Sequence, residues 1–270
     1  MQLLFVFAVT ILIYCCYGKS NILFLEPEAG GYIFEGDMIL SKESIYSAIN
    51  SGSIDLRYNK TGYAVSSSFS HKWPNKVIPY VIHPSAKNTV LNSVNLNGPT
   101  EKAIKSAMSA WEEKTCLRFI PRTVENDYIE FFDGGFGKCF SHVGRIGGKQ
   151  LISLGFGCFT AGVAMHEIGH AIGLYHEQSR PDRDDYVEIL WDNIQEDNKH
   201  NFLKYYRGEI DSFGSPYDFD SLMHYERSSF PKFPFLTTIR SKVNNVSYGQ
   251  RSYISKEDAI QVNKLYKCNK

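Results

Sequence analysis

The chain has 270 residues, of which 43% are hydrophobic, and its 29 basic and 29 acidic side chains give a formal net charge of zero. This length allows one or two domains, and the apolar content is sufficient for a sizeable core. No block of Lys or Arg stands out, so we expect no nucleic-acid partner.

The first eighteen residues have the pattern of a secretory signal peptide. Leu3 to Tyr17 form an apolar run interrupted by Thr10, and Cys16 and Gly18 are small residues at the positions that a signal peptidase requires. We predict cleavage after Gly18, and hence a secreted, extracellular protein. The alternative is a membrane anchor, but the run is shorter than the roughly 20 apolar residues that span a bilayer.

Residues 19–62 contain no cysteine and little periodicity, and we predict an irregular pro-segment with turns at its glycines and prolines. The alternative is an extension without function. Val77 to Ile82 follow as a predicted strand, in which Pro79 favours an edge position. Pro99 to Lys114 follow as a predicted helix, because its apolar residues recur on one face.

Further elements follow toward the C-terminus. Apolar runs predict strands at residues 117–120, 128–132 and 150–154. Thr160 to Ile172 are predicted to form a helix that ends at Gly173, and residues 255–267 a last helix, in which Ser255 and Asp258 are spaced as a capping box. Strands and helices in this order predict an α+β fold.

Histidines at positions 166, 170 and 176 carry the main chemical signal. His166 and His170 are four residues apart, so both face the same side of a helix and can bind one metal ion. Gly173 can adopt the left-handed conformation that ends the helix, which lets His176 return to the same ion. Three nitrogen ligands leave an open position, as in catalytic zinc sites.

Glu167 follows the first of these histidines and can reach a water molecule at the open position. Zinc lowers the pKa of its bound water from about 15.7 toward about 7 and polarises a carbonyl. Glu167 is then predicted to act as the general base of peptide-bond hydrolysis. Cobalt or copper would also suit the three histidines, since the ligands alone do not select zinc.

The run from His166 to Asp184, HEIGHAIGLYHEQSRPDRD, together with SLMHY at residues 221–225, resembles the astacin family of metzincin zinc metalloendopeptidases. The resemblance extends from about Trp73 to Cys268. It implies a two-lobed metzincin domain at 63–270, with a twisted mixed sheet and the active-site helix in the N-terminal lobe. The C-terminal lobe would be mostly irregular, with a final helix. Modules that follow many catalytic domains of this family are not expected.

Several residue roles are implied by this resemblance. Tyr225 would bind the single zinc ion in the resting enzyme and then swing away to stabilise the oxyanion. Met223 would form the turn beneath the metal, and Glu177 would hold the new N-terminus of the mature enzyme through a water-linked ion pair. In Phe34-Glu-Gly-Asp37, the carboxylate of Asp37 would bind the zinc of the zymogen, although the same residues could be a solvent-facing turn.

Four cysteines remain after signal removal, and an even number in an exported chain predicts two disulfides. Their spacing permits three pairings, of which the resemblance implies Cys116–Cys268 and Cys139–Cys158. Asn59 and Asn245 lie in sequons and are possible glycosylation sites.

The expected partners are protein or peptide substrates and an activating protease. That protease would cut between residues 57 and 64. We expect a monomer with no membrane association. Two other classes stay open: a binding protein that uses an inactive protease fold, and a zinc hydrolase with a non-peptide substrate.

Overall fold

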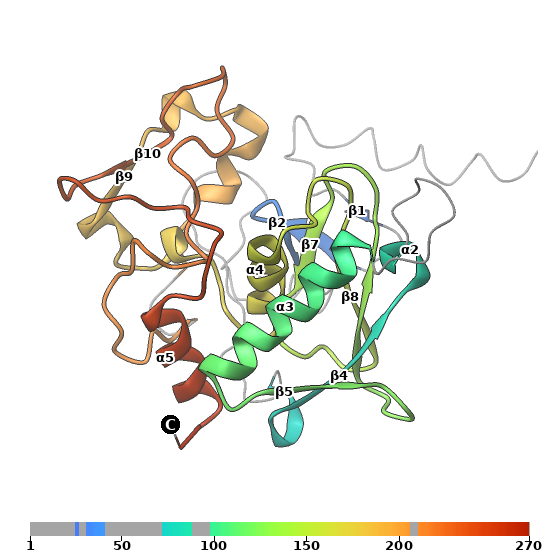
Figure 1. Ribbon diagram of the computed structural model, residues 1–270. Coiled ribbons are helices and arrows are strands. Elements are labelled where there is room, and N and C mark those ends of the chain that lie inside the picture. The colour runs from blue at the N-terminus through green and yellow to red at the C-terminus, as the bar shows by residue number, and fades with distance from the viewer. Residues whose placement is uncertain (1–24, 27–30, 41–71, 88–97, 206–209, 270) are drawn as a thin grey trace, which may run out of the picture.

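The computed structural model describes residues 25–26, 31–40, 72–87, 98–205 and 210–269 (Figure 1). The predicted signal peptide, the boundary at 57–64 and Asn59 lie outside the described residues. No helix among the described residues is long and apolar enough to cross a membrane.

A mixed sheet forms one part of the molecule, with the strand order β1-β2-β3-β7-β8-β6-β4-β5. Its pairs β4–β5, β4–β6, β6–β8 and β3–β7 are parallel, and its remaining pairs are antiparallel. The strands are β1 (Leu25–Glu26), β2 (Gly31–Phe34), β3 (Met38–Leu40), β4 (Val77–Ile82), β5 (Arg118–Pro121), β6 (Tyr128–Phe132), β7 (Cys139–His142) and β8 (Lys149–Leu154).

Helix α3 (Pro99–Lys114) packs against α4 (Ala161–Ala171), and the short helix α2 (Pro84–Lys87) precedes them (Figure 1). Proline is favoured in the first turn of a helix because its missing N–H would be unpaired there, and this explains the start at Pro99. Trp111 on α3 is fully buried, and its Nε1–H donates to the carbonyl of Met165 at 2.9 Å. The predicted apolar face of α3 therefore fixes the position of α4.

The ends of α4 follow local rules. The Thr160 hydroxyl accepts a hydrogen bond from the Val163 N–H and caps the first turn. Gly173 has φ +112°, a conformation that residues with a Cβ rarely adopt, and its N–H donates to the His170 carbonyl at 2.8 Å. The chain can then turn back beside its own helix.

The C-terminal part is mostly irregular and has a separate small core, which includes Val187, Phe202 and Ile239. It contains β9 (Val187–Ile189), which pairs with β10 (Ile239–Ser241). It also contains the 3₁₀ helices η3 (Glu177–Ser179), η4 (Arg183–Asp185), η5 (Trp191–Asn193) and η6 (Glu196–Phe202), whereas η2 (Pro74–Lys76) lies just before β4. Helix α5 (Lys256–Leu265) ends this part and begins at a capping box between Ser255 and Asp258.

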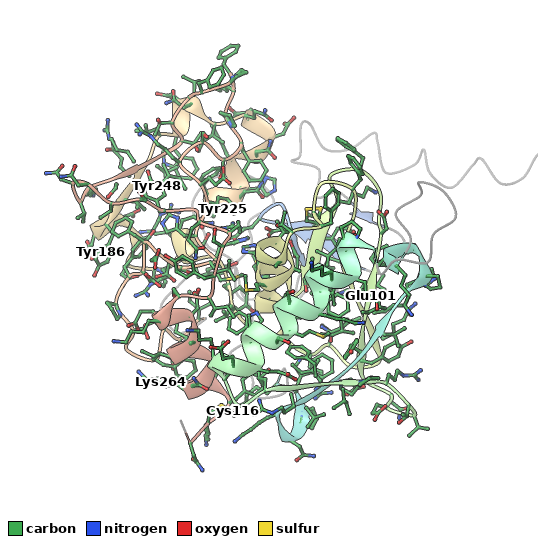
Figure 2. All side chains as sticks on the ribbon, viewed as in Figure 1. Glu101, Cys116, Tyr186, Tyr225, Tyr248 and Lys264 are labelled. Atoms are coloured by element: carbon green, nitrogen blue, oxygen red, sulfur yellow. A yellow bond between two sulfur atoms is a disulfide. The ribbon has the colours of Figure 1, made fainter. Side chains whose placement is uncertain are left out.

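Two disulfides lie at different places in this fold. Cys116, just after α3, is bonded to Cys268, so the bridge joins the first large helix to the C-terminal segment (Figure 2). Cys139 is bonded to Cys158 and ties the start of β7 to the loop that leads into α4.

The structure confirms the α+β class and corrects two expectations. The segment predicted to be irregular contains strands, since β2 and β3 form an antiparallel hairpin that pairs with β7. Pro79 does not lie on an edge strand, because β4 is flanked by β5 and β6. However, pairing with β6 begins only at Tyr80, so Pro79 lies where β4 has β5 alone as a neighbour, and the missing N–H is tolerated.

Candidate metal centre

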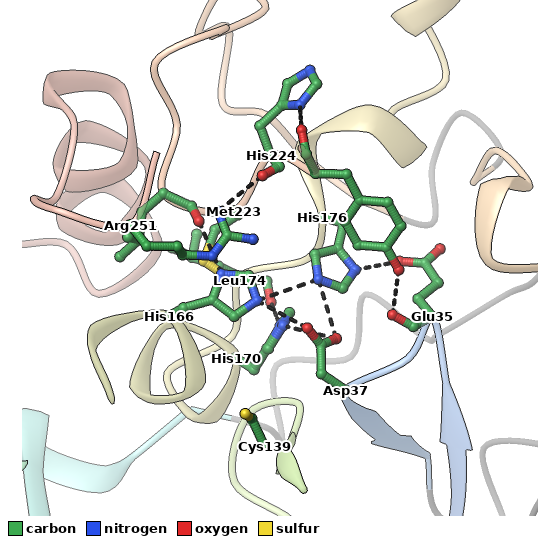
Figure 3. Close-up of polar contacts among 12 residues, drawn as sticks. Glu35, Asp37, Cys139, His166, His170, Leu174, His176, Met223, His224 and Arg251 are labelled. Carbon is green, nitrogen blue, oxygen red and sulfur yellow. Dashed lines mark hydrogen bonds and ion pairs between the residues drawn. The ribbon is translucent and has the colours of Figure 1, made fainter. Parts of the chain in front are cut away.

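Three buried imidazoles converge between α4 and the loop that follows it. His166 and His170 are one turn apart on α4, and their ring centroids are 4.7 Å apart. His176 returns after Gly173, and its ring centroid lies 4.7 Å from that of His170. The helix repeat and the turn at Gly173 thus bring the three rings together, as Figure 3 shows.

The Nδ1 atom of each ring contacts an oxygen that lies away from the centre of the cluster. Nδ1 of His166 lies 2.9 Å from the Leu222 carbonyl, and Nδ1 of His170 lies 2.9 Å from the Leu174 carbonyl. Nδ1 of His176 lies 2.7 Å from Oε2 of Glu35. Since these oxygens accept, Nδ1 carries the hydrogen and Nε2 presents its lone pair to the centre, as metal-binding histidines do.

Asp37 completes the cluster from the tip of the β2–β3 hairpin. Its Oδ2 lies 3.1 Å from Nε2 of His166, and its Oδ1 lies 3.2 Å from Nε2 of His176 and 3.6 Å from Nε2 of His170. The Nε2 atoms of His166 and His176 are 3.4 Å apart. Tetrahedral ligands at zinc–nitrogen bond lengths of about 2.0–2.1 Å lie about 3.3–3.4 Å from one another.

The group therefore fits a zinc ion. Its four side chains offer ligand atoms that all lie within 4.8 Å of one another. Oδ1 of Asp37 and Nε2 of His170 are buried and lack hydrogen-bond partners in the described structure. Buried polar atoms of this kind need a partner, and a cation at the centre supplies one to both. Three imidazoles and a carboxylate are suitable zinc ligands.

Glu167 lies on α4 beside the cluster and is 1% exposed. No donor among the described residues lies within hydrogen-bond distance of its Oε2. Burial, together with the neighbouring charge of Asp37, holds the pKa of Glu167 well above its usual range, while the Arg251 guanidinium opposes this shift. Groups whose pKa is shifted in this way are candidates for a functional role, and Glu167 is one of them.

Tyr225 is buried against the third histidine, with its ring centroid 4.7 Å from that of His176. Its hydroxyl donates to the backbone carbonyl of Glu35. The tyrosine for which the resemblance implies a metal-binding role is therefore engaged by the β2–β3 hairpin in this structure.

Met223 lies close to α4, and Glu177 begins η3 directly after His176. A Cβ at Gly169 would lie only 2.8 Å from Sδ of Met223, so the glycine between the histidines allows this methionine to pack under α4. Oε1 of Glu177 accepts hydrogen bonds from Arg180 Nη1 at 3.0 Å and from the Asp218 N–H at 2.7 Å. Burial raises the pKa of Glu177 to about 8, although Arg180 opposes this shift.

Glu177 also lines a cavity of about 390 Å³. Leu174, Phe213 and Lys264 contribute to its walls. Asn245 lies outside both the cavity and the metal centre, exposed on the loop after β10.

Two residues of the centre were not identified from the sequence. Glu35 is 1% exposed and contacts both His176 and Tyr225. It lies within the Phe34-Glu-Gly-Asp37 segment, so its closeness in sequence to Asp37 could have identified it as a neighbour of the histidines. Arg251 donates to the His224 carbonyl at 2.9 Å (Figure 3). Its charge also acts on Glu167 and on Asp37. No spacing rule connects this arginine with the histidines.

Comparisons with known proteins agree with this geometry. The peptidase family described as Astacin matches residues 65–267. Bone morphogenetic protein 1 of Xenopus laevis is 46% identical over 201 residues, which cover 73% of this chain and 27% of the relative. Blastula protease 10 of Paracentrotus lividus is 40% identical over 246 residues, which cover 87% and 39%. The chain thus spans between about a quarter and two fifths of the length of these relatives.

A solved structure gives the same result for the fold. High choriolytic enzyme 1, a hatching enzyme zinc-protease from Oryzias latipes, superposes with a TM-score of 0.66 at 38% identity. The match covers 76% of this chain and 100% of the hatching enzyme chain. The match at the family level, the shared fold and the zinc-type cluster show that this chain belongs to the astacin family of peptidases.

Proposed function

We propose that the chain is the precursor of a secreted zinc metalloendopeptidase that hydrolyses internal peptide bonds of proteins. The observation that carries this proposal is the convergence of three Nε2 atoms on the carboxylate of Asp37. Membership of a peptidase family supports protein substrates. The apolar run at the N-terminus supports export of the protein.

Zinc held by His166, His170 and His176 would act as a Lewis acid that lowers the pKa of a bound water and polarises the substrate carbonyl. Glu167 takes the proton from that water and delivers it to the amine of the departing product. Its burial next to the cluster and its unpaired Oε2 support this role, because a desolvated carboxyl group can exchange a proton near neutral pH.

Tyr225 would be a metal ligand in the resting enzyme and would donate its hydroxyl to the oxyanion that develops on the substrate. Its ring lies against His176, with the ring centroids 4.7 Å apart, which supports a role for this side chain at the metal centre. A donor aimed at developing charge is worth more than one aimed at the ground state.

Residues 19–62 act as the inhibitory segment, and residues 63–270 as the catalytic domain. β3 pairs with the outer edge of β7, and Asp37 at the hairpin tip lies 3.1 Å from Nε2 of His166 and 3.2 Å from Nε2 of His176, which supports a role in which its carboxylate would exclude water from the metal. When the hairpin leaves, the β7 edge offers free N–H and C=O groups to an extended substrate. After cleavage by an activating protease near residues 57–64, the new N-terminus would enter the cavity beside Glu177.

The remaining proposals concern the surroundings of the enzyme. We expect a monomer in solution that binds neither nucleic acid nor membranes. Asn245 is exposed and accessible to glycosylation. The disulfides Cys116–Cys268 and Cys139–Cys158 stabilise the protein outside the cell.

Incubation of the matured protein with a mixed peptide library tests the proposal. We expect cleavage at internal bonds, loss of cleavage after treatment with a zinc chelator, and recovery after addition of zinc. A matured protein that retains one zinc ion and cleaves no peptide or protein would instead indicate a binding protein with an inactive protease fold.

A further inference from the structure

Two exposed phenylalanines and a half-buried third, Phe159, form an aromatic platform at one end of the sheet. Phe136 lies in the β6–β7 loop and is 82% exposed, while Phe156 lies in the β8–α4 loop and is 58% exposed. Their rings stack at a centroid distance of 5.6 Å, and Phe159 contacts Phe156 edge to face at 5.6 Å. Exposed apolar groups gathered in this way indicate an interaction site, since scattered exposure would need no explanation.

The platform is held rigidly by its two loops. The Gly137 N–H donates to the Phe156 carbonyl at 2.8 Å, and the Gly155 N–H donates to the Lys138 carbonyl at 3.1 Å. A Cβ at Gly155 would lie 1.8 Å from the Gly135 carbonyl oxygen, so the two backbones touch. The Cys139–Cys158 disulfide joins the same loops. A preorganised surface loses little entropy when it binds a partner.

The platform continues the edge of β7, the strand with which β3 of the hairpin pairs. The hairpin pairs only with Ser141 and His142 of this strand among the described residues. Cys139, at the N-terminal end of β7, is three residues from Phe136. At about 3.3 Å per residue, the stretch from Ser141 back to Phe136 spans at most about 16 Å.

We propose that Phe136, Phe156 and Phe159 form a subsite for an apolar side chain of the polypeptide substrate. The proposal rests on the proposed peptidase function. A chain extended along the β7 edge, with its scissile bond at the histidines, reaches the platform three to five residues away. These are the substrate residues on the side of the scissile bond that faces the N-terminal end of β7. Continuity with the β7 edge favours a polypeptide occupant over a second copy of the chain, since a stable dimer buries about 800 Å² per partner and three rings offer less.

A series of quenched peptides with one common scissile bond tests this inference. The peptides carry Phe, Leu, Ser or Asp at the third to fifth positions on either side, and a short peptide lacks these positions. We compare the matured wild type with the double variant Phe136→Ser/Phe156→Ser. Val124→Ser is the matched control, because Val124 is 84% exposed but lies before β6, at the end opposite the platform.

For the wild type, we expect Phe or Leu at one of these positions to raise kcat/KM about tenfold over Ser, the scale of a modest apolar pocket. The double variant should lose this preference and keep wild-type activity on the short peptide, whereas the control should keep both. An equal preference in the double variant, or no preference in the wild type, overturns the proposal. The proposal is also overturned if the double variant differs from the wild type only in weaker self-association or in weaker binding to phosphatidylcholine vesicles. If the matured wild type retains zinc and cleaves none of the peptides, long or short, the proposed peptidase function fails instead.

Discussion

Replacement of Asp37 by Asn should release activity in the uncleaved precursor. The carboxylate lies between 3.1 and 3.6 Å from all three Nε2 atoms, so its negative charge faces the histidine cluster. Asparagine keeps the shape of the side chain but removes its charge. The β3–β7 pairing does not depend on this side chain, since the Ser141 N–H donates to the Asp37 backbone carbonyl.

The size of the effect follows from the lost contacts. A hydrogen bond or contact to a charged group contributes about 1.5–3 kcal/mol, and contacts made by one carboxylate are not additive. A loss of about 3 kcal/mol raises the open fraction of the precursor by about 100-fold. The activity of the intact precursor should rise by that factor, up to the activity of the mature enzyme.

The assay measures hydrolysis of a fluorogenic peptide by precursor that gel electrophoresis shows to be uncut. Zinc content is determined on the same sample. Asp192→Asn is the matched control, because that carboxylate is exposed on η5. The double variant Asp37→Asn/Glu167→Gln should be silent, which assigns the released activity to this centre. If the Asp37→Asn precursor retains zinc and is as silent as the wild type, Asp37 does not block the centre.

The other predictions concern the hairpin and the catalytic groups. Gly36→Ala should also release precursor activity, since the added Cβ would lie 2.6 Å from Cζ of Phe230. Gly214→Ala is the control and should release none, because Gly214 has a similar positive φ but no neighbour within 4 Å of the added Cβ. Equal activity of the two variant precursors would show that the contact with Phe230 is not the cause. Glu167→Gln should lower kcat of the mature enzyme by about 10²–10⁴-fold with zinc retained, as checked by steady-state kinetics and metal analysis. Tyr225→Phe should lower kcat by about 10²–10³-fold with little change in KM, and an unchanged kcat would exclude the oxyanion role.

Local rules determined much of this protein. The helix at 99–114 was predicted with the bounds that the structure shows, because Pro99 fixes its start and its apolar spacing has the helical period. The start of α4 at Ala161, after the N-cap Thr160, and its end before Gly173 also follow from residues next to one another in the chain. The four-residue spacing of His166 and His170 needs only the helix repeat to place both rings on one face.

Only the tertiary structure decided which distant segments meet. The spacing of four cysteines permitted three pairings, and the fold brings together two specific pairs. The segment before residue 62 lacked a strand pattern, yet β3 forms where the free edge of β7 provides partners for its backbone. Glu35 and Arg251 reach the histidines through folding alone, since no local period relates residues so far apart in the chain. The sequence therefore determined the three candidate ligands, and the long-range contacts of the folded chain decided what surrounds them.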